Sequence, residues 1–459
     1  MSEFHTLGID IGSTGIKALV VHDGREVFVA QSPTPWRHGP GGTTEMDADH
    51  LIDTVRGLLS QVDVWLESCT PPAHVAAIGM AGMGETGFVL DAGATAVAPA
   101  FAWFDPRGGD RVAAMPGWLR SEFPGRTGLP VGVQVSATKI GLLADGGVTL
   151  AGRVWANLPE FVAHVLGGTL VSDYSLASRT GILDQDSGLA WPEMLEYLGA
   201  PQDFLPQLTD SGTDLGTARA SWLPRSLAGA RLTVAGHDHL VSAAANGATI
   251  ADRYHVSMGT AEVLLRILDG PPDADARARL AEYFINSVRH VVPGQHVLVA
   301  GVKTGLLMRR ALQLCGISDR AGRDGLDARV CEVVDADPDA SHGIDITGAR
   351  NDDGVLGMTI RSDGIGPAEM FHAILDHGND EIKILVDALD KEIPPARSTL
   401  LTGGWASMRC VQRARGAVLP DVQVSTRSQD TAYGAAIFAA RLLDDHPNST
   451  TIRSTGEEQ

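Results

Sequence analysis

The chain has 459 residues and a mass of 48.3 kDa, with 44% hydrophobic and 20% charged residues. That length is too great for one hydrophobic core, so we expect two domains. The formal net charge of −20 and the pI near 5.1 exclude a broad basic surface for nucleic acid and argue against binding to an anionic membrane. A phosphorylated ligand stays compatible with this charge, because one lysine and a few backbone N–H groups suffice to hold it.

The cysteines and the N-terminus bear on the compartment. The cysteines are too sparse for a disulfide scaffold and form no C-x-x-C pair, so we expect reduced, buried thiols; they are Cys69, Cys315, Cys331 and Cys410. The N-terminal sequence has neither a basic n-region nor an apolar h-region, and no stretch reaches the ~18 apolar residues of a membrane span. We therefore expect a cytoplasmic protein.

The first half begins with β-type runs. Residues 6–31 contain LGIDI, IKALVV and EVFVA, separated by glycine turns at 12–15 and 23–25, which predicts an antiparallel meander of three strands. Residues 32–47 have the composition of a loop. Apolar residues then recur at helical spacing over 46–68, and HVAAIGMA and GFVLD predict two further strands. This order indicates a mixed sheet with helices packed on it.

The second half repeats some of these patterns, after a stretch at 110–230 with mixed signals. A strand, a turn and a small-residue helix are predicted over 231–248, a strand-turn-strand unit over 253–267, a strand, glycine turn and helix over 398–417, and a closing helix with an Ala/Gly face over 431–443. We place the domains at 1–231 and 232–447, with a disordered tail at 448–459. GIDIGSTGIKALVV and HVSMGTAEVLLRI are similar, which suggests one hairpin unit used twice.

Each of these hairpins contains a Gly-Ser or Gly-Thr turn. Such a turn can direct several backbone N–H groups and a hydroxyl at one point and so bind phosphate oxygens. Asp10 at the end of the first strand could then face a hydrated Mg2+, and Lys17 could approach a phosphate. The simpler interpretation is that Asp10 caps the turn and Lys17 is a solvated strand residue.

Two further glycine-containing or acidic turns have alternative interpretations. TGGWASM (402–408) can let a flat ring lie against backbone, or can be an ordinary strand-to-helix turn. Asp238 in AGHDHL is either a helix N-cap or a general base, and a helix N-terminus would favour its ionised form. His237 and His239 flank it, but their spacing matches no common zinc pattern.

Polar residues near a tryptophan suggest a site for a polyhydroxylated ligand. GMGETGFVLD and FAWFDPRG place Glu85, Trp103, Asp105 and Arg107 in a short span. An aromatic face can contact C–H groups while carboxylates and a guanidinium bind hydroxyls. A core tryptophan with a surface Asp–Arg pair would look the same.

Taken in order, these stretches resemble the FGGY family of carbohydrate kinases, which have the actin-like ATPase fold. GIDIGSTGIKALVV is similar to the first phosphate loop of the family, WFDPRG to its W-x-D-x-R sugar segment, and SDYSLASRTGILD (172–184) to its D-x-S-x-A-S-x-T-x-x-x-D stretch. AGHDH resembles the segment with the catalytic aspartate, VSMGTAEVLL the second phosphate loop, LLTGGWASM the adenosine motif and QDTAYGAAIFAA the closing helix. The resemblance covers almost the whole chain.

The resemblance implies two actin-like (ribonuclease H-like) α/β domains, each a mixed sheet flanked by helices, around a central cleft. It implies ATP and Mg2+ as cofactors, a sugar or polyol as substrate, and leaves a homodimer open. Asp238 would be the catalytic base, and Asp10 and Asp238 would hold magnesium directly or through water. The residues implied around ATP are Gly12, Ser13, Thr14, Lys17, Gly259, Thr260, Gly403, Gly404 and Trp405, and those around the sugar are Glu85, Thr86, Trp103, Asp105, Arg107 and His239.

The chain departs from the family patterns at the sugar site. Xylulose kinases usually carry Gln-Met-His-Gly at AGMGET and glycerol kinases Asn-Gln-Arg-Glu-Thr, whereas this chain has Gly84 in place of that arginine and His239 in place of the usual Asn or Gln. We expect Gly84 to leave room for a ligand longer than glycerol, with a ketopentose favoured. Two other functions stay open: an actin-like regulatory protein that binds ATP or sugar without catalysis, and an actin- or chaperone-like assembly ATPase, against which the sugar segment at 101–108 counts.

Overall fold

The computed structural model describes residues 4–245, 247, 251–337, 340–348, 357–425 and 430–443. Contacts divide the chain into two compact units. Unit 1 is the described part of 1–249, 288–296 and 429–459, and unit 2 is the described part of 250–287 and 297–428. The predicted tail at 448–459 lies outside the described residues.

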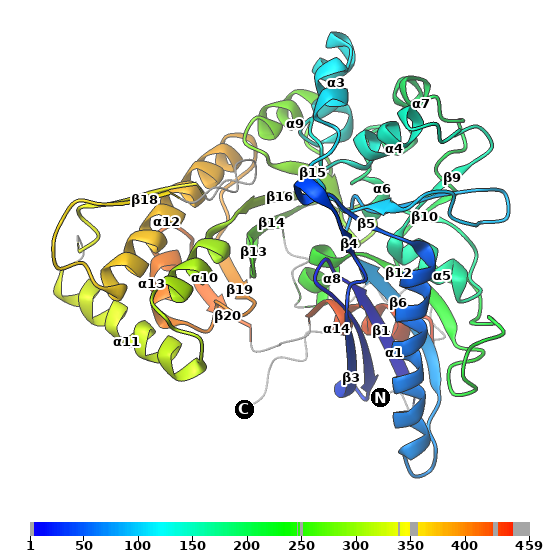
Figure 1. The fold of residues 1–459 in the computed structure, drawn as a ribbon, viewed down its shortest axis with the longest axis horizontal. Coiled ribbons are helices and arrows are strands. Elements are labelled where there is room, and N and C mark those ends of the chain that lie inside the picture. Colours follow the sequence, from blue (N-terminus) through cyan, green and yellow to red (C-terminus); the bar gives the residue numbers. More distant parts are fainter. Residues whose placement is uncertain are drawn as a thin grey trace. The chain divides into compact units, whose positions relative to one another are not determined.

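Unit 1 is built on a five-stranded sheet with the order β12-β6-β1-β2-β3 (Figure 1). The predicted meander is confirmed, because β1, β2 and β3 pair antiparallel in sequence order. β6 pairs parallel with β1, and β12 pairs parallel with β6, so the carboxyl ends of these three strands meet at one edge. The strands are β1 (His5–Ile11), β2 (Gly15–His22), β3 (Arg25–Pro33), β6 (Val75–Gly82) and β12 (Arg231–His237).

Helices cover both faces of this sheet. On one face, alternate residues of β1 and β6 join a hydrophobic core with α1 (Ala48–Ser68) and α5 (Leu158–Val165). The apolar stripe predicted for 46–68 faces this core, and all six of its members are buried: Leu51, Val55, Leu58, Leu59, Val62 and Leu66.

The opposite face is covered by α14 (Asp430–Arg441), which approaches the strands at backbone distance. A Cβ on Gly8 would lie 1.8 Å from the carbonyl oxygen of Ala432, and one on Gly79 would lie 2.1 Å from that of Ala435. Larger residues in either strand would push the helix away. The predicted small-residue packing of the closing helix is therefore confirmed.

The rest of unit 1 consists of short elements between these strands. The segment 32–47, expected to be a loop, also contains two short strands, because β5 pairs with both β4 and β8. The strands are β4 (Arg37–His38), β5 (Thr44–Met46), β7 (Gly87–Leu90), β8 (Ala100–Phe101), β9 (Val154–Asn157), β10 (Ser172–Asp173) and β11 (Leu208–Thr209). The helices are η1 (Pro40–Gly42), α2 (Gly109–Ala114), α3 (Gly117–Thr127), α4 (Ser136–Asp145), α6 (Tyr174–Ala177), α7 (Pro192–Leu198) and α8 (Asp238–Ala245).

The second sheet has six strands in the order β15-β16-β14-β13-β19-β20. The strands are β13 (Arg253–Met258), β14 (Glu262–Leu268), β15 (Asn286–Arg289), β16 (His296–Val302), β19 (Ser398–Thr402) and β20 (Val422–Val424), with a separate hairpin of β17 (Ile344–Thr347) and β18 (Gly357–Ile360). The helices are α9 (Ala274–Ala281), α10 (Thr304–Leu314), α11 (Arg320–Ala336), α12 (Pro367–Glu392) and α13 (Arg409–Gly416).

The two sheets share one connectivity. Each begins with an antiparallel hairpin, β1–β2 or β13–β14, whose first strand then pairs parallel with a strand from much later in the chain, β6 or β19. A further strand, β12 or β20, pairs parallel with β6 or β19 in turn. This shared order supports the interpretation that one unit is used twice.

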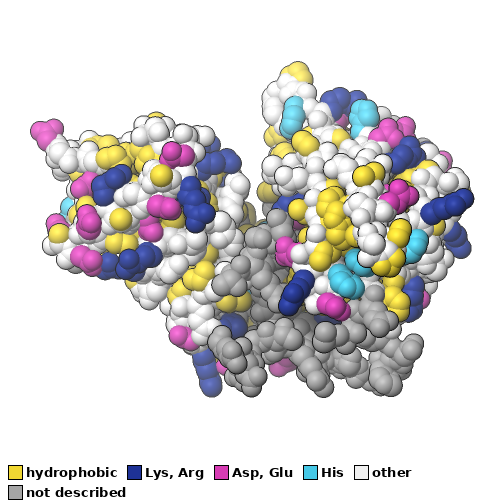
Figure 2. All heavy atoms as spheres, turned by 90° about the horizontal axis from the view of Figure 1, so that it is seen from below, with side chains coloured by type: hydrophobic (Ala, Val, Ile, Leu, Met, Phe, Trp, Pro, Cys, Tyr) yellow, Lys and Arg dark blue, Asp and Glu magenta, His cyan; other side chains and the backbone are white. Residues whose placement is uncertain are grey.

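The division by contacts differs from the predicted boundary at residues 231 and 232. β12 pairs with β6, and α14 packs on β1, so both belong to unit 1 although they follow residue 230. All four cysteines carry free thiols, as expected, but only Cys410 is buried. Within the described residues, no helix combines the length and the apolar character that a membrane crossing needs. Figure 2 shows acidic and basic side chains interspersed on the visible face of both units.

A buried ion pair joins the hairpin of unit 2 to α13. Arg415 donates to both carboxylate oxygens of Glu262, at 2.6 and 2.8 Å, and the two side chains are 0% and 1% exposed. Glu262 is the first residue of β14, directly after the hairpin turn. Arg415 also donates to the side-chain oxygen of Asn379 on α12 at 2.7 Å. The turn at 259–261 is thus tied to two helices.

We predict that Arg415→Gln lowers the free energy of unfolding by about 3–5 kcal/mol, because it leaves the Glu262 carboxylate buried without its partner. Urea unfolding would measure the change. Arg279→Gln, which removes the more exposed pair with Glu392, is the control and should cost at most about 1 kcal/mol. An Arg415→Met/Glu262→Leu double variant should recover most of the loss. A double variant as unstable as Arg415→Gln would show that the unpaired charge is not the cause.

Candidate active site

The predicted base and magnesium residues come together at the edge where β1, β6 and β12 end. Asp10 is the penultimate residue of β1, and Gly82 at the end of β6 pairs with both Ile11 and His237. Asp238 follows directly as the first residue of α8. Ligands of α/β sheets bind at the carboxyl ends of strands, so this edge is where a substrate is expected.

The two carboxylates at this edge have very different proton affinities. Burial and the nearby charge of Asp238 raise the pKa of Asp10 to about 7, although Lys17 opposes the shift. Burial also acts to raise the pKa of Asp238, but the neighbouring His239, His237 and Arg179 and a hydrogen bond from the His239 N–H together lower it below its usual value. Asp238 therefore loses its proton at lower pH than Asp10 does.

Asp10 also has an unsatisfied oxygen. Its Oδ1 is buried, and no donor among the described residues reaches it. A buried acceptor beside a second carboxylate is costly unless a cation compensates. Lys17 lies directly across the hairpin from Asp10. Two close carboxylates with an open oxygen match the oxygen ligands that Mg2+ prefers, so these residues fit the predicted metal.

The turn between β1 and β2 is held by residues that sequence reasoning missed. The Gly12 N–H donates to Gly15 O at 3.1 Å, which closes the turn. From the segment after β3, the Thr34 hydroxyl donates to Gly12 O at 2.6 Å and the Trp36 indole N–H donates to Ser13 O at 2.7 Å. These bonds engage carbonyl groups of the turn. No local sequence signal marks Thr34 and Trp36, because their partners lie more than twenty residues away.

Glu85 lies in the same region as Asp238. Its side chain is buried and forms an ion pair with Arg179, and its backbone adopts a left-handed conformation with φ of +61°. Burial raises the pKa of Glu85, Arg179 and His239 oppose this, and the charge of Asp238 adds to it. A non-glycine residue with positive φ is uncommon and is often found at functional sites. The sequence predicts a role for Glu85 but does not predict its ion pair with Arg179.

The space expected beside Gly84 is not open. A Cβ on Gly84 would lie 2.8 Å from Cδ2 of His237 and 3.0 and 3.1 Å from Cγ and Cβ of Arg179. The expectation that Gly84 leaves room for a longer ligand is therefore wrong at this point. The stem of Arg179 and the ring of His237 fill the place where a side chain would begin.

Thr86 and Trp103 are linked through a backbone bond. The Thr86 hydroxyl accepts a hydrogen bond from the Trp103 N–H at 3.0 Å, and Thr86 is fully buried. Trp103 itself is 39% exposed and packs edge-to-face on Phe104, which in turn contacts Trp36. An exposed aromatic side chain fixed in this way can offer its face to C–H groups of a sugar, as predicted. The role of Thr86 in the structure is to hold that segment.

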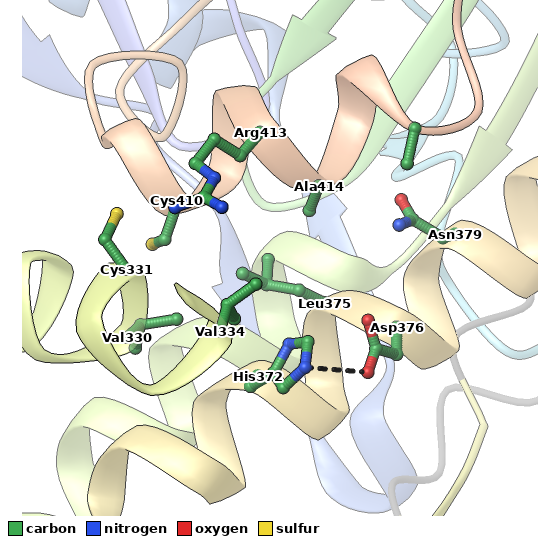
Figure 3. Close-up of a pocket in the computed structure, with 11 residues that line it drawn as sticks. Val330, Cys331, Val334, His372, Leu375, Asp376, Asn379, Cys410, Arg413 and Ala414 are labelled. Carbon is green, nitrogen blue, oxygen red and sulfur yellow. Dashed lines mark ion pairs between the residues drawn. The ribbon is translucent and has the colours of Figure 1, made fainter. Parts of the chain in front are cut away.

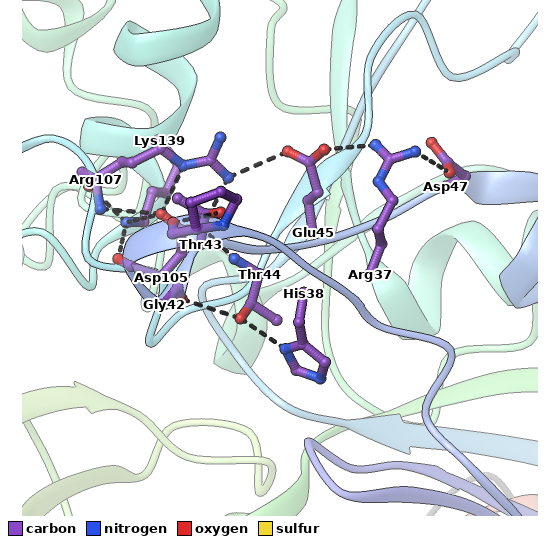
Figure 4. Close-up of polar contacts among 11 residues, drawn as sticks. Arg37, His38, Gly42, Thr43, Thr44, Glu45, Asp47, Asp105, Arg107 and Lys139 are labelled. Atoms are coloured by element: carbon purple, nitrogen blue, oxygen red, sulfur yellow. Dashed lines mark hydrogen bonds and ion pairs between the residues drawn. The ribbon is translucent and has the colours of Figure 1, made fainter.

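Asp105 and Arg107 belong to a network of protein groups (Figure 4). Asp105 is fully buried, and its two oxygens accept bonds from the N–H groups of Thr44 and Arg107 and from the Arg107 guanidinium. Arg107 also reaches Glu45 at 3.2 Å, and the Lys139 ammonium donates to backbone oxygens of the same segment. The Asp105 carboxylate is thus used within the protein. Direct sugar contact by these two residues stays a prediction.

The backbone that carries Asp238 is supported by the 172–184 segment. The Ser175 hydroxyl donates to Asp173 at 2.5 Å and accepts from the His237 N–H at 3.0 Å. Asp173 also accepts from Ser211 and from two N–H groups of α6, and its own N–H donates to buried Glu160. Gly236 has φ of +111°, and a Cβ there would lie 2.4 Å from the Ser175 hydroxyl. The residue before the predicted base is therefore positioned by a buried network.

In unit 2, the predicted ATP residues lie on adjoining turns. Gly259 and Thr260 are exposed in the turn between β13 and β14, and a Cβ on Gly305 at the start of α10 would lie 1.9 Å from Gly259 O. Gly403 has φ of +89°, and a Cβ there would lie 2.6 Å from Met258 O, while the Trp405 N–H donates to the same oxygen at 3.4 Å. Gly404 is exposed beside them. The second hairpin and the TGGW turn are thus in direct contact.

A separate pocket of about 260 Å³ lies among α11, α12 and α13 (Figure 3). Its lining includes the Cys331 and Cys410 thiols and an ion pair between His372 and Asp376 at 3.3 Å. None of the site residues predicted from the sequence lines it.

We predict that Ser175→Ala lowers the free energy of unfolding by about 1–3 kcal/mol, because the His237 N–H and one Asp173 oxygen lose a buried partner. Thermal and urea unfolding would measure it. Ser121→Ala is the control, since the exposed Ser121 hydroxyl bonds only a local carbonyl, and its effect should stay within about 0.5 kcal/mol. Equal stability of the two variants would contradict the supporting role of Ser175.

We further predict that Gly84→Ala destabilises the protein by about 1–3 kcal/mol, because the new Cβ overpacks against His237 and Arg179. Gly57→Ala, at an open and exposed position of α1, should instead stabilise by up to about 1 kcal/mol. Unfolding curves of both variants distinguish overpacking from a general effect of removing a glycine. A neutral Gly84→Ala would mean that the place beside Gly84 is free.

Comparison with known proteins agrees with this geometry. Residues 5–244, more than half of the chain, match the model of the FGGY family of carbohydrate kinases, N-terminal domain. The chain is 30% identical over 231 residues to a glycerol kinase of Xanthobacter autotrophicus, covering 46% of this chain and 44% of the relative, and 26% identical over 243 residues to one of Thermococcus gammatolerans, covering 51% and 48%. The matched part thus spans about half the length of these curated relatives.

Solved structures show the same fold over nearly the whole chain. A xylulose kinase from Rhodospirillum rubrum has a TM-score of 0.82 at 23% identity, covering 96% of this chain and 90% of that one. A Plasmodium falciparum glycerol kinase with ADP has a TM-score of 0.82 at 16% identity, with coverage of 96% and 90%. The fold class predicted from the sequence, two actin-like α/β domains, is confirmed. The chain therefore belongs to the FGGY family of carbohydrate kinases.

Proposed function

We propose that this protein transfers the γ-phosphate of ATP to a hydroxyl group of a small sugar or polyol. The observation that carries the proposal is that Asp10 and Asp238 lie at the carboxyl ends of β1 and β12, two parallel strands on either side of β6, with the pKa of Asp238 lowered and Glu85 nearby. Membership of the family and the glycerol kinase relatives support the same reaction class.

Asp238 is the proposed general base. It takes the proton of the acceptor hydroxyl as the acceptor oxygen attacks the γ-phosphorus, and the bond to the β,γ-bridging oxygen breaks to release ADP. A carboxylate in this role must be ionised, and the surroundings of Asp238 lower its pKa below the usual value. Phosphoryl transfer needs mainly in-line positioning and charge neutralisation, so a well-placed carboxylate and phosphate-binding turns suffice.

Magnesium would be held by Asp10 and Asp238, directly or through water, and would supply charge neutralisation at the phosphates. The open Oδ1 of Asp10 supports this assignment. For ATP, we propose the turn at Gly12–Thr14 and Lys17 in unit 1, and Gly259 and Thr260 in unit 2, as phosphate ligands. Gly403, Gly404 and Trp405 would lie beside the adenosine.

We propose that the site binds an uncharged acceptor in preference to an anionic one. Asp10, Glu85 and Asp238 place three carboxyl groups near Lys17 and Arg179, which disfavours a sugar acid over a sugar or polyol. The proposed acceptor ligands are Glu85, His239 and Trp103, with Thr86, Asp105 and Arg107 supporting the same region. A ketopentose is the first compound to test, because His239 departs from the glycerol kinase pattern.

We predict that the purified protein with ATP and Mg2+ releases ADP in the presence of one or more compounds from a panel of pentuloses, hexuloses and polyols. Asp238→Asn should lower kcat by about 10²–10⁴-fold, because the acceptor loses its proton acceptor. A coupled assay for ADP measures both. Asp53→Asn, an exposed acid on α1, is the matched control and should leave kcat unchanged.

An Asp238→Asn variant as active as the parent would show that the base is assigned wrongly. If no compound gives ADP but some protect the protein against heat, the protein is instead a regulatory binder of ATP or sugar.

A further inference from the structure

We infer that Arg179 determines how the acceptor is bound, as a positioning and specificity residue for the reaction proposed above, on which this inference rests. Arg179 lies just after α6, in the 172–184 segment, and its side chain is 11% exposed. It touches Gly84 with its stem and pairs with Glu85 through its guanidinium. Arg179, from a distant segment of the chain, therefore contacts both Gly84 and Glu85.

The stem of Arg179 leaves little room for a side chain at position 84. A Cβ on residue 84 would already lie 3.0 Å from Cγ and 3.1 Å from Cβ of Arg179, closer than side-chain carbons pack. A side chain at 84 would therefore require Arg179 to shift by a few tenths of an ångström. Glycerol kinases usually carry an arginine where this chain has Gly84. In this chain the cationic group beside Glu85 comes from 179 instead, so it approaches from another direction.

The charge of Arg179 keeps Glu85 usable as an acceptor of hydrogen bonds. The pair is nearly buried, with side chains 11% and 9% exposed, and Glu85 also lies near the charge of Asp238. Without Arg179, a buried carboxylate beside another carboxylate would protonate or turn away. A guanidinium only donates hydrogen bonds and a carboxylate only accepts them. A ligand held by this pair needs neighbouring groups that do both, and adjacent hydroxyls meet that requirement.

The backbone around Arg179 is well fixed, as a positioning residue requires. The Arg179 N–H donates to Leu176 O at 3.0 Å, and the preceding Ser178 hydroxyl donates to Tyr174 O at 2.5 Å and accepts from the Arg289 N–H at 3.2 Å. The same segment supports the His237 N–H through Ser175. One rigid segment therefore places Arg179 and braces the strand end that leads into Asp238.

The test uses Arg179→Gln and Arg179→Lys in the full chain, with Arg111→Gln as control. Arg111 is 15% exposed and paired with Asp145, which makes it a matched arginine elsewhere in unit 1. We expect Arg179→Gln to raise the acceptor KM about 10–100-fold, the range for lost hydrogen bonds to a charged group, with the KM for ATP within about twofold. Arg179→Lys should recover only part, because lysine cannot present a planar fork. Arg111→Gln should change neither KM.

A pair of acceptors sharpens the result. The parent should prefer a polyol over its analogue lacking one of two adjacent hydroxyls, and Arg179→Gln should reduce that preference in kcat/KM by about tenfold or more. An unchanged acceptor KM and preference in an active Arg179→Gln enzyme would contradict the inference while the kinase proposal stands. Equal losses for ATP and acceptor with a lowered Tm would also contradict it, since they indicate a purely structural role. A parent that releases no ADP with any acceptor would instead overturn the proposed function, and the inference with it.

Discussion

The repulsion between Asp10 and Asp238 is the constraint around which this end of unit 1 is organised. The pairing of β1 with β6 and of β6 with β12 brings the two carboxyl groups to one edge of the sheet. Burial alone would raise both pKa values, so the surrounding groups decide which acid stays ionised. Two histidines, Arg179 and a backbone N–H act on Asp238, whereas Asp10 has Lys17 and an oxygen that no donor in the described part of the chain reaches. The asymmetry supports the proposed roles, proton transfer for Asp238 and a cation at Asp10.

The positions of Asp10 and Asp238 depend on hydrogen bonds from residues that take no part in the proposed reaction. The Asp173–Ser175 network fixes the N–H of His237, and Gly236 has to be glycine for Ser175 to come close. Thr34 and Trp36 fix carbonyl groups of the first turn. In unit 2, Arg415 and Glu262 do the same for the second turn. Each hairpin is therefore held from outside, the first through carbonyl groups of its turn and the second through the first residue of its second strand.

What the sequence predicted well is local. Strand alternation, glycine turns and the apolar stripe of α1 depend on neighbours in the chain, and the meander, both hairpins and the closing helix were predicted from them. The motifs also placed Asp10, Asp238 and Glu85 correctly in one region. The sequence did not predict contacts between residues far apart in the chain. The ion-pair partner of Glu85 is Arg179, 94 positions away (179 − 85 = 94), and no periodicity connects the two. For the same reason the sequence did not show that Thr44 and Arg107 donate to the Asp105 carboxylate.

Two of the arginine–glutamate pairs, Arg415–Glu262 and Arg179–Glu85, differ in how far they are enclosed. Arg415 and Glu262 are completely enclosed, and Arg415 also meets Asn379 and a backbone carbonyl, so its donors are used within unit 2. Arg179 and Glu85 keep about a tenth of their side-chain surface exposed, and they lie at a strand end beside an ionised aspartate and a residue with positive φ. A fully enclosed ion pair restricts the conformations of the segments that carry it. An ion pair that stays partly exposed beside a reactive acid can also donate hydrogen bonds to a ligand and accept them from it. The position of Gly84 links the second pair to the choice of acceptor, because any side chain there would move the arginine. Arg179, which fills the space beside Gly84, would then determine the acceptor specificity of this protein.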